Sequence, residues 1–200
     1  MTKRDLDAQE TKKKILETAI KLFSEYGIET VTVDDITQHA GVSKGSFYTH
    51  FPSKDSVLVE QFNQIDAYYE KTFQEISPQT PASEQLRILI ASMCHYCSNV
   101  CGVNVMKVVY MNQISLSDRQ NILNKSDQRA VYVLLERIVE WGLRSGEFQV
   151  TLDREVLVEY LARFGRSLIY DWCLYDGKED LETMGKEFFD LIIKWLTKPQ

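Results

Sequence analysis

The chain has 200 residues, of which 44% are hydrophobic, and a formal net charge of −6. This length and composition allow a sizeable hydrophobic core without support from metals or disulfides. The charged N-terminus and the lack of a long apolar run exclude a signal peptide and a membrane span, and the four scattered cysteines do not form a secreted disulfide framework, so we expect a cytoplasmic protein.

Helical periodicity dominates the whole chain. Prolines and glycines are few, and the apolar residues between them recur at three- and four-residue spacing, which predicts an all-α fold. We expect about nine helices, over residues 11–26, 33–39, 44–50, 54–76, 82–98, 103–111, 118–144, 153–174 and 179–197. Residues 1–56 should form one domain with a helix-turn-helix, and residues 57–200 a larger helical domain.

The first three helices carry clear boundary signals. Gly27 suits the left-handed cap that ends a helix. Thr32 and Asp35 form a capping-box-like pair before the second helix, and Ser43 caps the third. Only residues 40–42, with a central glycine, separate the second helix from the third. Two short helices joined in this way have helix-turn-helix geometry.

The third helix has the composition of a helix that enters the major groove of DNA. Gly45 and Ser46 are small enough for a close approach, and its hydroxyls and its single lysine can donate to phosphates and base edges. We expect Phe47 and Phe51 to point inward and to fix the angle of this helix. Because the helix contains no arginine, specificity would depend on hydroxyl and methyl contacts or on DNA shape.

The net charge argues against DNA as a partner, because Lys and Arg normally supply much of the affinity for phosphates. The acidity is uneven, however. Residues 1–56 carry eight Lys or Arg against nine Asp or Glu, and the remainder carries fifteen against twenty. Lysines also gather at residues 12–14, and Lys44 and Lys54 lie at the start of the third helix and just after it. The N-terminal domain is therefore compatible with DNA.

Residues 32–36, 40–51 and 53–54 resemble the tetracycline-repressor (TetR) family of regulators. The similarity is close over residues 11–58, and the later helices are similar in length and layout. It implies an N-terminal three-helix DNA-binding domain and a C-terminal helical domain for ligand binding and dimerisation. The resemblance implies phosphate contacts from Thr32, Ser43, Tyr48, His50 and Lys54, and groove contacts from Lys44, Gly45, Ser46 and Thr49.

The resemblance also implies a regulator, most often a repressor, that binds a palindromic double-stranded operator as a homodimer and is released by a small-molecule effector. The last two helices carry broad apolar faces suited to a four-helix interface between two chains. The expected interface residues are Tyr160, Phe164, Leu168, Phe188, Phe189, Ile192 and Trp195.

The effector is expected to be largely apolar, because aromatic residues and methionines are frequent in the middle helices. Each of these side chains also suits plain hydrophobic core. The candidates for the effector pocket are Tyr69, Phe73, Met93, Tyr96, Cys97, Tyr110, Met111, Trp141, Phe164 and Trp172.

Two alternatives stay open. Cys94, Cys97 and Cys101 fall on one helical face with His95 beside it, so the regulator could respond to a soft metal or an oxidant, although cysteine is also a common core residue. The chain could instead be a helical interaction protein with a non-functional helix-turn-helix. No motif of a catalytic site or of a cofactor site occurs, so neither an enzyme nor a cofactor is expected.

Overall fold

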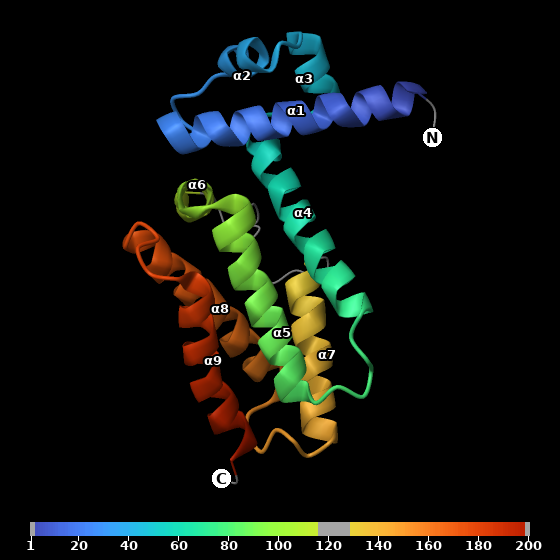
Figure 1. Ribbon diagram of the computed structural model, residues 1–200, viewed down its shortest axis with the longest axis vertical. Coiled ribbons are helices and arrows are strands. Elements are labelled where there is room, and N and C mark those ends of the chain that lie inside the picture. Colours follow the sequence, from blue (N-terminus) through green and yellow to red (C-terminus); the bar gives the residue numbers. More distant parts are fainter. Residues whose placement is uncertain (1–2, 116–128, 199–200) are drawn as a thin grey trace. The chain divides into compact units, whose positions relative to one another are not determined.

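The computed structural model describes residues 3–115 and 129–198 and contains only helices within them (Figure 1). The nine described α-helices and one π-helix are α1 (Lys3–Tyr26), α2 (Val33–Ala40), α3 (Lys44–His50), α4 (Asp55–Gln74), α5 (Ala82–His95), η1 (Tyr96–Cys101), α6 (Val103–Ser115), α7 (Ala130–Arg144), α8 (Arg154–Leu174) and α9 (Leu181–Thr197). The predicted all-α fold is confirmed.

The described residues fall into two compact units. One unit contains residues 3–64 and 107–115, and the other contains 65–106 and 129–198. The boundary expected after residue 56 falls inside α4, which runs without a break from Asp55 to Gln74.

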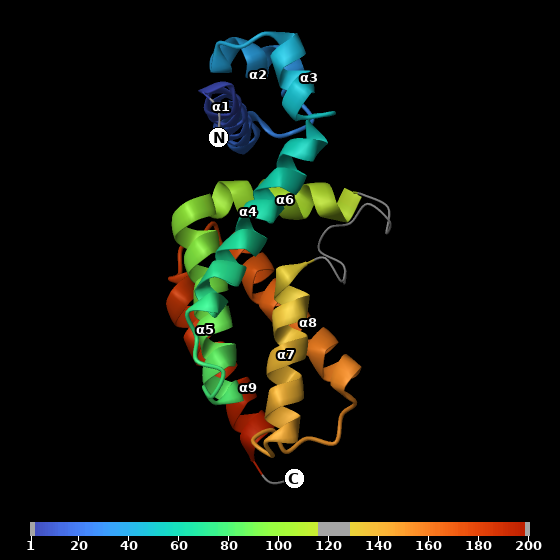
Figure 2. The ribbon, with the colours of Figure 1, turned by 90° about the vertical axis from the view of Figure 1, so that its right-hand side faces the viewer.

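In the first unit, α2 and α3 lie together on one side of α1 (Figures 1 and 2). Helices α2 and α3 cover one face of α1, and the apolar residues of that face recur every three or four positions, as expected from the sequence. The buried residues of α1 are Ile15, Leu16, Ala19, Leu22 and Phe23. Ile36 of α2 and Phe47 of α3 are fully buried as well. This core holds α3 in place.

In the second unit, α5 packs against α9 and α7, and α8 packs against α7 and α9. Gly185 lets α9 pass close to α5, because a Cβ atom at this position would collide with the sulfur of Cys94. Glu147, in the turn after α7, accepts hydrogen bonds from the backbone N–H groups of Ala82 (2.6 Å) and Ser83 (3.0 Å). It thereby caps the N-terminus of α5, for which Pro81 supplies no side-chain cap.

Two helix boundaries differ clearly from the prediction, and one expected helix is described only in part. Helix α1 begins at Lys3 rather than Thr11. The sequence did not indicate this first part, because residues 3–10 are exposed and carry no apolar period that would reveal a helix. The helix expected over 82–98 changes into η1 after His95, and η1 ends at Gly102, whose φ is +80°. The first part of the helix expected over 118–144 lies outside the described residues.

None of the described helices, taken singly, combines the length and the apolar composition needed to cross a membrane.

Candidate functional site

The helix-turn-helix is held by hydrogen bonds that its own sequence supplies. The Thr32 hydroxyl accepts from the backbone N–H of Asp35 (3.2 Å), and the Asp35 carboxylate accepts from the backbone N–H of Thr32 (2.8 Å). The Thr32 hydroxyl also donates to the Asp35 carboxylate (2.6 Å), and this bond, together with the one from the Thr32 backbone N–H, lowers the pKa of Asp35. Gly41 has a φ of +62° and donates to carbonyls at the end of α2, and Ser43 accepts from the N–H of Ser46 (3.1 Å). The predicted caps are confirmed.

Two buried aromatic residues fix the orientation of α3. Phe47 and Phe51 are fully buried, with ring centroids 5.8 Å apart, which confirms the prediction that both point inward. The ring of Tyr48 meets Phe47 edge-on at 5.5 Å, yet 52% of the Tyr48 side chain stays exposed. The buried side chains of Phe47 and Phe51 therefore hold α3 with its opposite face exposed to solvent.

The residues expected to contact DNA lie mostly on the surface of the first unit. Lys44, Gly45, Tyr48 and Thr49 are exposed, and the pairs 44/48 and 45/49 share faces of α3 because their members are four positions apart. The exposed candidates outside these pairs are Thr32 and Ser43, whereas Ser46, His50 and Lys54 are half-buried. The structure thus brings most of the candidates onto one segment.

Lys44 has an acidic partner within the same unit. Its ammonium nitrogen lies 2.7 Å from a carboxylate oxygen of Asp34 on α2, and this hydrogen bond raises the pKa of Lys44. Both side chains are exposed, so solvent screens the attraction and the pair is weak. A phosphate that approached Lys44 would compete with Asp34 for the ammonium.

Lys54 makes different contacts from those expected. Its ammonium group donates to the backbone carbonyls of Ile28 (2.6 Å), Val31 (3.3 Å) and Glu29 (3.5 Å). These carbonyls belong to the loop between α1 and α2, where no helix supplies them with donors. Lys54 therefore fastens this loop to the start of α4, and a phosphate role for it has no support in these contacts.

Lys12 is a structural residue that the sequence did not reveal. Its ammonium lies 2.6 Å from the Glu60 carboxylate on α4 and 5.9 Å from the ring centroid of Phe51. In the sequence, Lys12 is one of three consecutive lysines, and only the helical periodicity of α1 could have distinguished it from Lys13 and Lys14. The contact joins α4 to the helix-turn-helix.

The candidates for the effector pocket differ in burial and fall into both compact units. Met111 and Trp141 are 68% and 39% exposed, and the indole nitrogen of Trp141 donates to the Thr80 carbonyl, so neither is an interior residue of its unit. Tyr110 falls in the same unit as the helix-turn-helix. The candidates within the second unit are buried Tyr69, Met93, Tyr96, Cys97 and Trp172, and half-buried Phe73 and Phe164.

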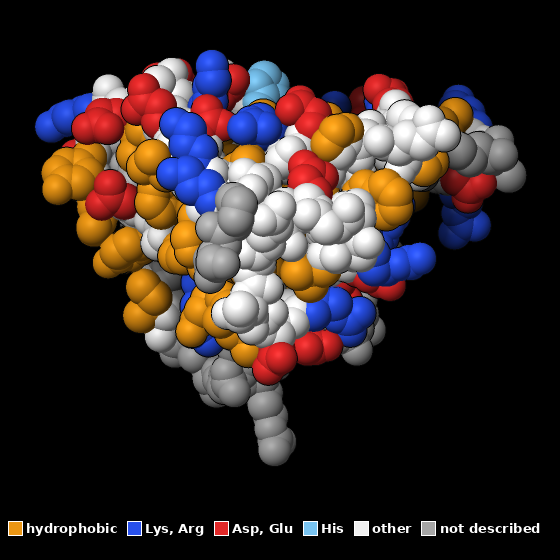
Figure 3. All heavy atoms as spheres, turned by 90° about the horizontal axis from the view of Figure 1, so that it is seen from below, with side chains coloured by type: hydrophobic (Ala, Val, Ile, Leu, Met, Phe, Trp, Pro, Cys, Tyr) orange, Lys and Arg blue, Asp and Glu red, His pale blue; other side chains and the backbone are white. Residues whose placement is uncertain are grey.

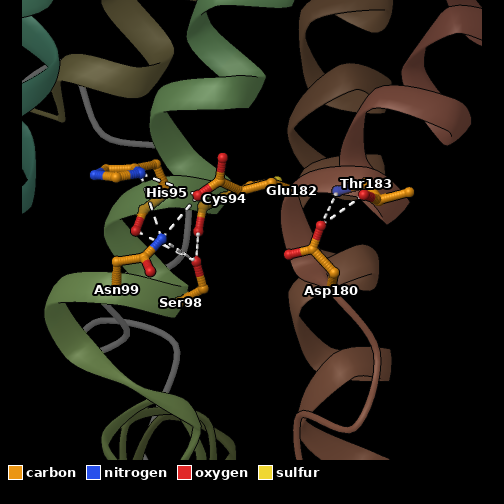
Figure 4. Close-up of polar contacts among 7 residues, drawn as sticks. All are labelled: Cys94, His95, Ser98, Asn99, Asp180, Glu182 and Thr183. Atoms are coloured by element: carbon orange, nitrogen blue, oxygen red, sulfur yellow. Dashed lines mark hydrogen bonds and ion pairs between the residues drawn. The ribbon is translucent and has the colours of Figure 1, made fainter.

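Two of the clustered cysteines, Cys94 and Cys97, are buried. Burial raises the pKa of Cys94 to about 12 and that of Cys97 well above its ordinary value, so both are neutral thiols. His95 contacts α9 instead: its Nδ1 lies 3.0 Å from Glu182, which also accepts from the side-chain amide of Asn99 at 2.7 Å (Figure 4). No group of three or more potential metal ligands occurs within 3–115 and 129–198. The metal- or redox-responsive alternative is not favoured.

Helices α8 and α9 expose an apolar surface. Figure 3 shows hydrophobic side chains gathering on the side of the molecule where these helices lie. A groove there is lined by Leu152, Tyr160, Phe164, Phe188, Leu191, Ile192 and Trp195. Leu168 lines a second groove beside it. Phe189, also expected at the interface, is buried within its own chain, whereas Leu191, on the apolar face of the same helix, is exposed.

Two family models cover most of the chain. The model described as "Bacterial regulatory proteins, tetR family" matches residues 15–60, and "YsiA-like protein, C-terminal region" matches residues 62–195. The chain belongs to the TetR family. As a TetR-family member it is a transcriptional regulator with an N-terminal helix-turn-helix. The first model ends at Glu60, the partner of Lys12, so the TetR DNA-binding segment includes the first turns of α4.

The chain is also similar in sequence to individual bacterial regulators. The fatty acid metabolism regulator protein of Bacillus subtilis is 22% identical over 90% of this chain and 92% of its own length. The regulator YuxN of the same organism is 36% identical, but over only 44% of this chain and 32% of its own length.

Solved structures of this family share the fold. The fatty acid degradation regulator FadR from Bacillus halodurans has a TM-score of 0.75 at 20% identity, covering 92% of this chain and 94% of its own. FadR from Bacillus subtilis, solved in complex with stearoyl-CoA, has a TM-score of 0.71 at 20% identity, covering 91% and 97%.

Proposed function

We propose that this chain is a ligand-responsive repressor that binds a palindromic operator as a homodimer and is released by an apolar, acyl-type effector. The observation that carries the DNA-binding part is the exposed face of α3 on its buried base of Phe47 and Phe51. A recognition helix must be both accessible and rigid, and this arrangement supplies both.

In the complex, α3 enters the major groove. Lys44, Gly45, Ser46 and Thr49 are proposed to meet the groove, where the small residues permit close approach. The residues proposed to contact phosphates are Thr32, Ser43, Tyr48 and His50. Because the helix has no arginine, we expect moderate affinity from one protomer and a strong dependence on the second.

The exposed surface of α8 and α9 is the proposed dimer interface. This surface exposes the apolar or aromatic side chains of Tyr160, Phe188, Leu191 and Trp195. Monomeric proteins rarely expose such side chains in one cluster. An interface between two copies of one surface produces twofold symmetry. Twofold symmetry matches the two half-sites of a palindromic operator.

The effector class is proposed from relatives of known ligand. Two FadR structures that share the fold were solved with stearoyl-CoA and with lauroyl-CoA, the second from Thermus thermophilus at 18% identity and a TM-score of 0.64. Tyr69, Met93 and Tyr96 give the second unit of this chain an aromatic and thioether interior, which is compatible with an acyl chain.

The test is operator binding by fluorescence anisotropy, with duplex fragments from upstream of the protein's own gene. We expect salt-sensitive binding, release by dodecanoyl-CoA but not by coenzyme A, and at least a tenfold loss of affinity in Tyr48→Ala with the dimer intact. Unchanged affinity in Tyr48→Ala would contradict the role of α3. Retention of DNA at saturating dodecanoyl-CoA would contradict the effector class.

A further inference from the structure

A carboxylate in the second unit has one oxygen without a hydrogen-bond donor. The guanidinium Nε of Arg129, directly before α7, donates to Oδ2 of Asp66 on α4 at 2.7 Å, and each side chain is only 13% exposed. The other oxygen, Oδ1, is buried, and no donor reaches it from any described residue. This pair was not among the candidates from the sequence.

Such an oxygen is costly in the folded chain. An ionised carboxylate has about four acceptor positions, and a buried oxygen that receives no donor forfeits the hydrogen bonds it would have in water. Buried polar atoms are nearly always paired, and the exceptions concentrate at functional sites. A ligand that donates a hydrogen bond to Oδ1 would therefore gain binding free energy there.

Residues around Asp66 are those expected of an effector site. Tyr69 lies one turn further along α4 and is buried. Burial raises its pKa, Cys97 and Asp66 add to the rise, and Arg129 opposes it, so its phenol lies near all three groups. Tyr96 stacks near Tyr68, with 5.0 Å between ring centroids. We name Asp66, Tyr69, Tyr96, Cys97 and Arg129 the Asp66 cluster.

Two members of the Asp66 cluster, Tyr96 and Cys97, begin the π-helix η1. π-helical turns are rare and occur frequently at functional sites. It turns the side chains of the helix out of the register that α5 would otherwise continue. This irregularity is a second observation, independent of the Asp66 carboxylate, that points to the same place.

We propose that Asp66 Oδ1 accepts a hydrogen bond from a neutral N–H or O–H group of the effector, and that in an acyl-thioester effector this donor is the amide next to the thioester arm. The inference rests on the proposed function. Arg129 already balances the charge of Asp66, so a cationic donor would add an uncompensated buried charge. The carboxylate of a free fatty acid would be repelled by Oδ1, because both groups are negatively charged.

The test uses two thioesters that differ at one atom. The first is the dodecanoyl thioester of N-acetylcysteamine, which carries an amide N–H. The second has a methyl group on the same nitrogen. Titration calorimetry on the full-length protein should give about tenfold tighter binding of the first, the usual effect of one hydrogen bond to a charged acceptor.

Asp66→Asn separates the hydrogen bond from the bulk of the methyl group. Arg129 still requires an acceptor, so the asparagine oxygen should face Arg129 and its NH2 group should face the effector. The preference for the N–H probe should then vanish. The matched control is Asp190→Asn, because Asp190 accepts from Arg87 Nε at 2.9 Å on the surface, and its loss should leave the preference unchanged.

Equal affinities of the wild-type protein for the two probes, or failure of both to bind, would overturn the proposal, and this comparison does not require Asp66→Asn to fold. A preference that persists in a folded Asp66→Asn would also overturn it. Operator release by dodecanoyl-CoA is measured in parallel. If release occurs while the two probes bind equally, only the role of Asp66 is wrong and the proposed function stands.

Discussion

Lys12 of α1 and Glu60 of α4 form a 2.6 Å ion pair that connects the helix-turn-helix to the helix that follows it. The two side chains are 38% and 23% exposed, so the pair is less screened than an ordinary surface pair. Lys12 also lies over the ring of Phe51, and the contact therefore joins the base of α3 to α4.

Lys12→Met should weaken operator binding, although Lys12 itself need not contact DNA. Loss of the ion pair and of the contact with Phe51 should lower the free energy of unfolding by about 0.5–1.5 kcal/mol. Chemical denaturation and anisotropy measure the two effects. Lys13→Met is the control, because Lys13 pairs with Glu17 at 3.7 Å on the open surface. Equal effects of the two substitutions would remove the special role of Lys12.

Lys54→Met distinguishes a loop-fastening lysine from a phosphate-binding one. Without the hydrogen bonds to the α1–α2 loop, the protein should be destabilised by about 1–3 kcal/mol. The slope of log affinity against log salt concentration should stay the same. If Lys54 bound a phosphate, the slope would instead decrease by about 0.9 for each phosphate that the variant no longer neutralises. Lys44→Met, measured alongside, should lower the affinity, because Lys44 is proposed to meet the groove.

Asp34→Asn should strengthen operator binding. The Asp34 carboxylate holds the ammonium of Lys44 and would repel an approaching phosphate. Its neutralisation should raise the affinity by about three- to tenfold at low salt, and less at high salt because of screening. Asp7→Asn makes the same charge change on the exposed part of α1 and should have a smaller effect. A decrease in affinity for Asp34→Asn would contradict this competition.

Trp195→Glu should convert the dimer to a monomer. A carboxylate in the apolar groove of α8 and α9 would be buried without a partner in the dimer. Light scattering after size-exclusion chromatography gives the mass. The control is Val100→Glu, which adds the same charge at an exposed apolar residue of η1. A dimer that survives Trp195→Glu and Leu191→Glu would place the interface elsewhere.

Alkaline pH should destabilise the protein through Cys94. The thiol has a pKa of about 12 in the folded chain and about 9 when unfolded, so between these values it is neutral in the folded state and ionised in the unfolded state. Unfolding then releases a proton, and stability falls as pH rises, by up to about 1.4 kcal/mol per pH unit. Denaturation from pH 8 to 11 should show a shallower fall in Cys94→Ala; parallel curves would contradict the buried neutral thiol.

The sequence predicted features that depend on neighbouring residues in the chain. The caps at Thr32, Gly41 and Ser43 are determined within three or four residues, so their positions were predictable. Phe47 and Phe51 were recognised as buried because short amphipathic helices have only one apolar face.

Features that depend on distant residues were not predictable. The sequence predicts Lys54 as a phosphate contact, and nothing in its neighbours indicates that loop carbonyls 23–26 residues earlier are its partners. The residue types of Trp141 and Met111 favour burial, whereas their exposure depends on which elements reach them. The pairing of Asp66 with Arg129 spans 63 residues and carries no local signal.

The Lys12 to Glu60 contact determines where this regulator can be divided for engineering. Hybrid sensors are made by joining the DNA-binding domain of one regulator to the ligand-binding domain of another. A junction at residue 56 would keep Lys12 from one parent and take the residue at position 60 from the other, leaving the ammonium without its carboxylate. Junctions placed after Gln64 would transfer both residues together, and only such hybrids should inherit the operator affinity of the parent.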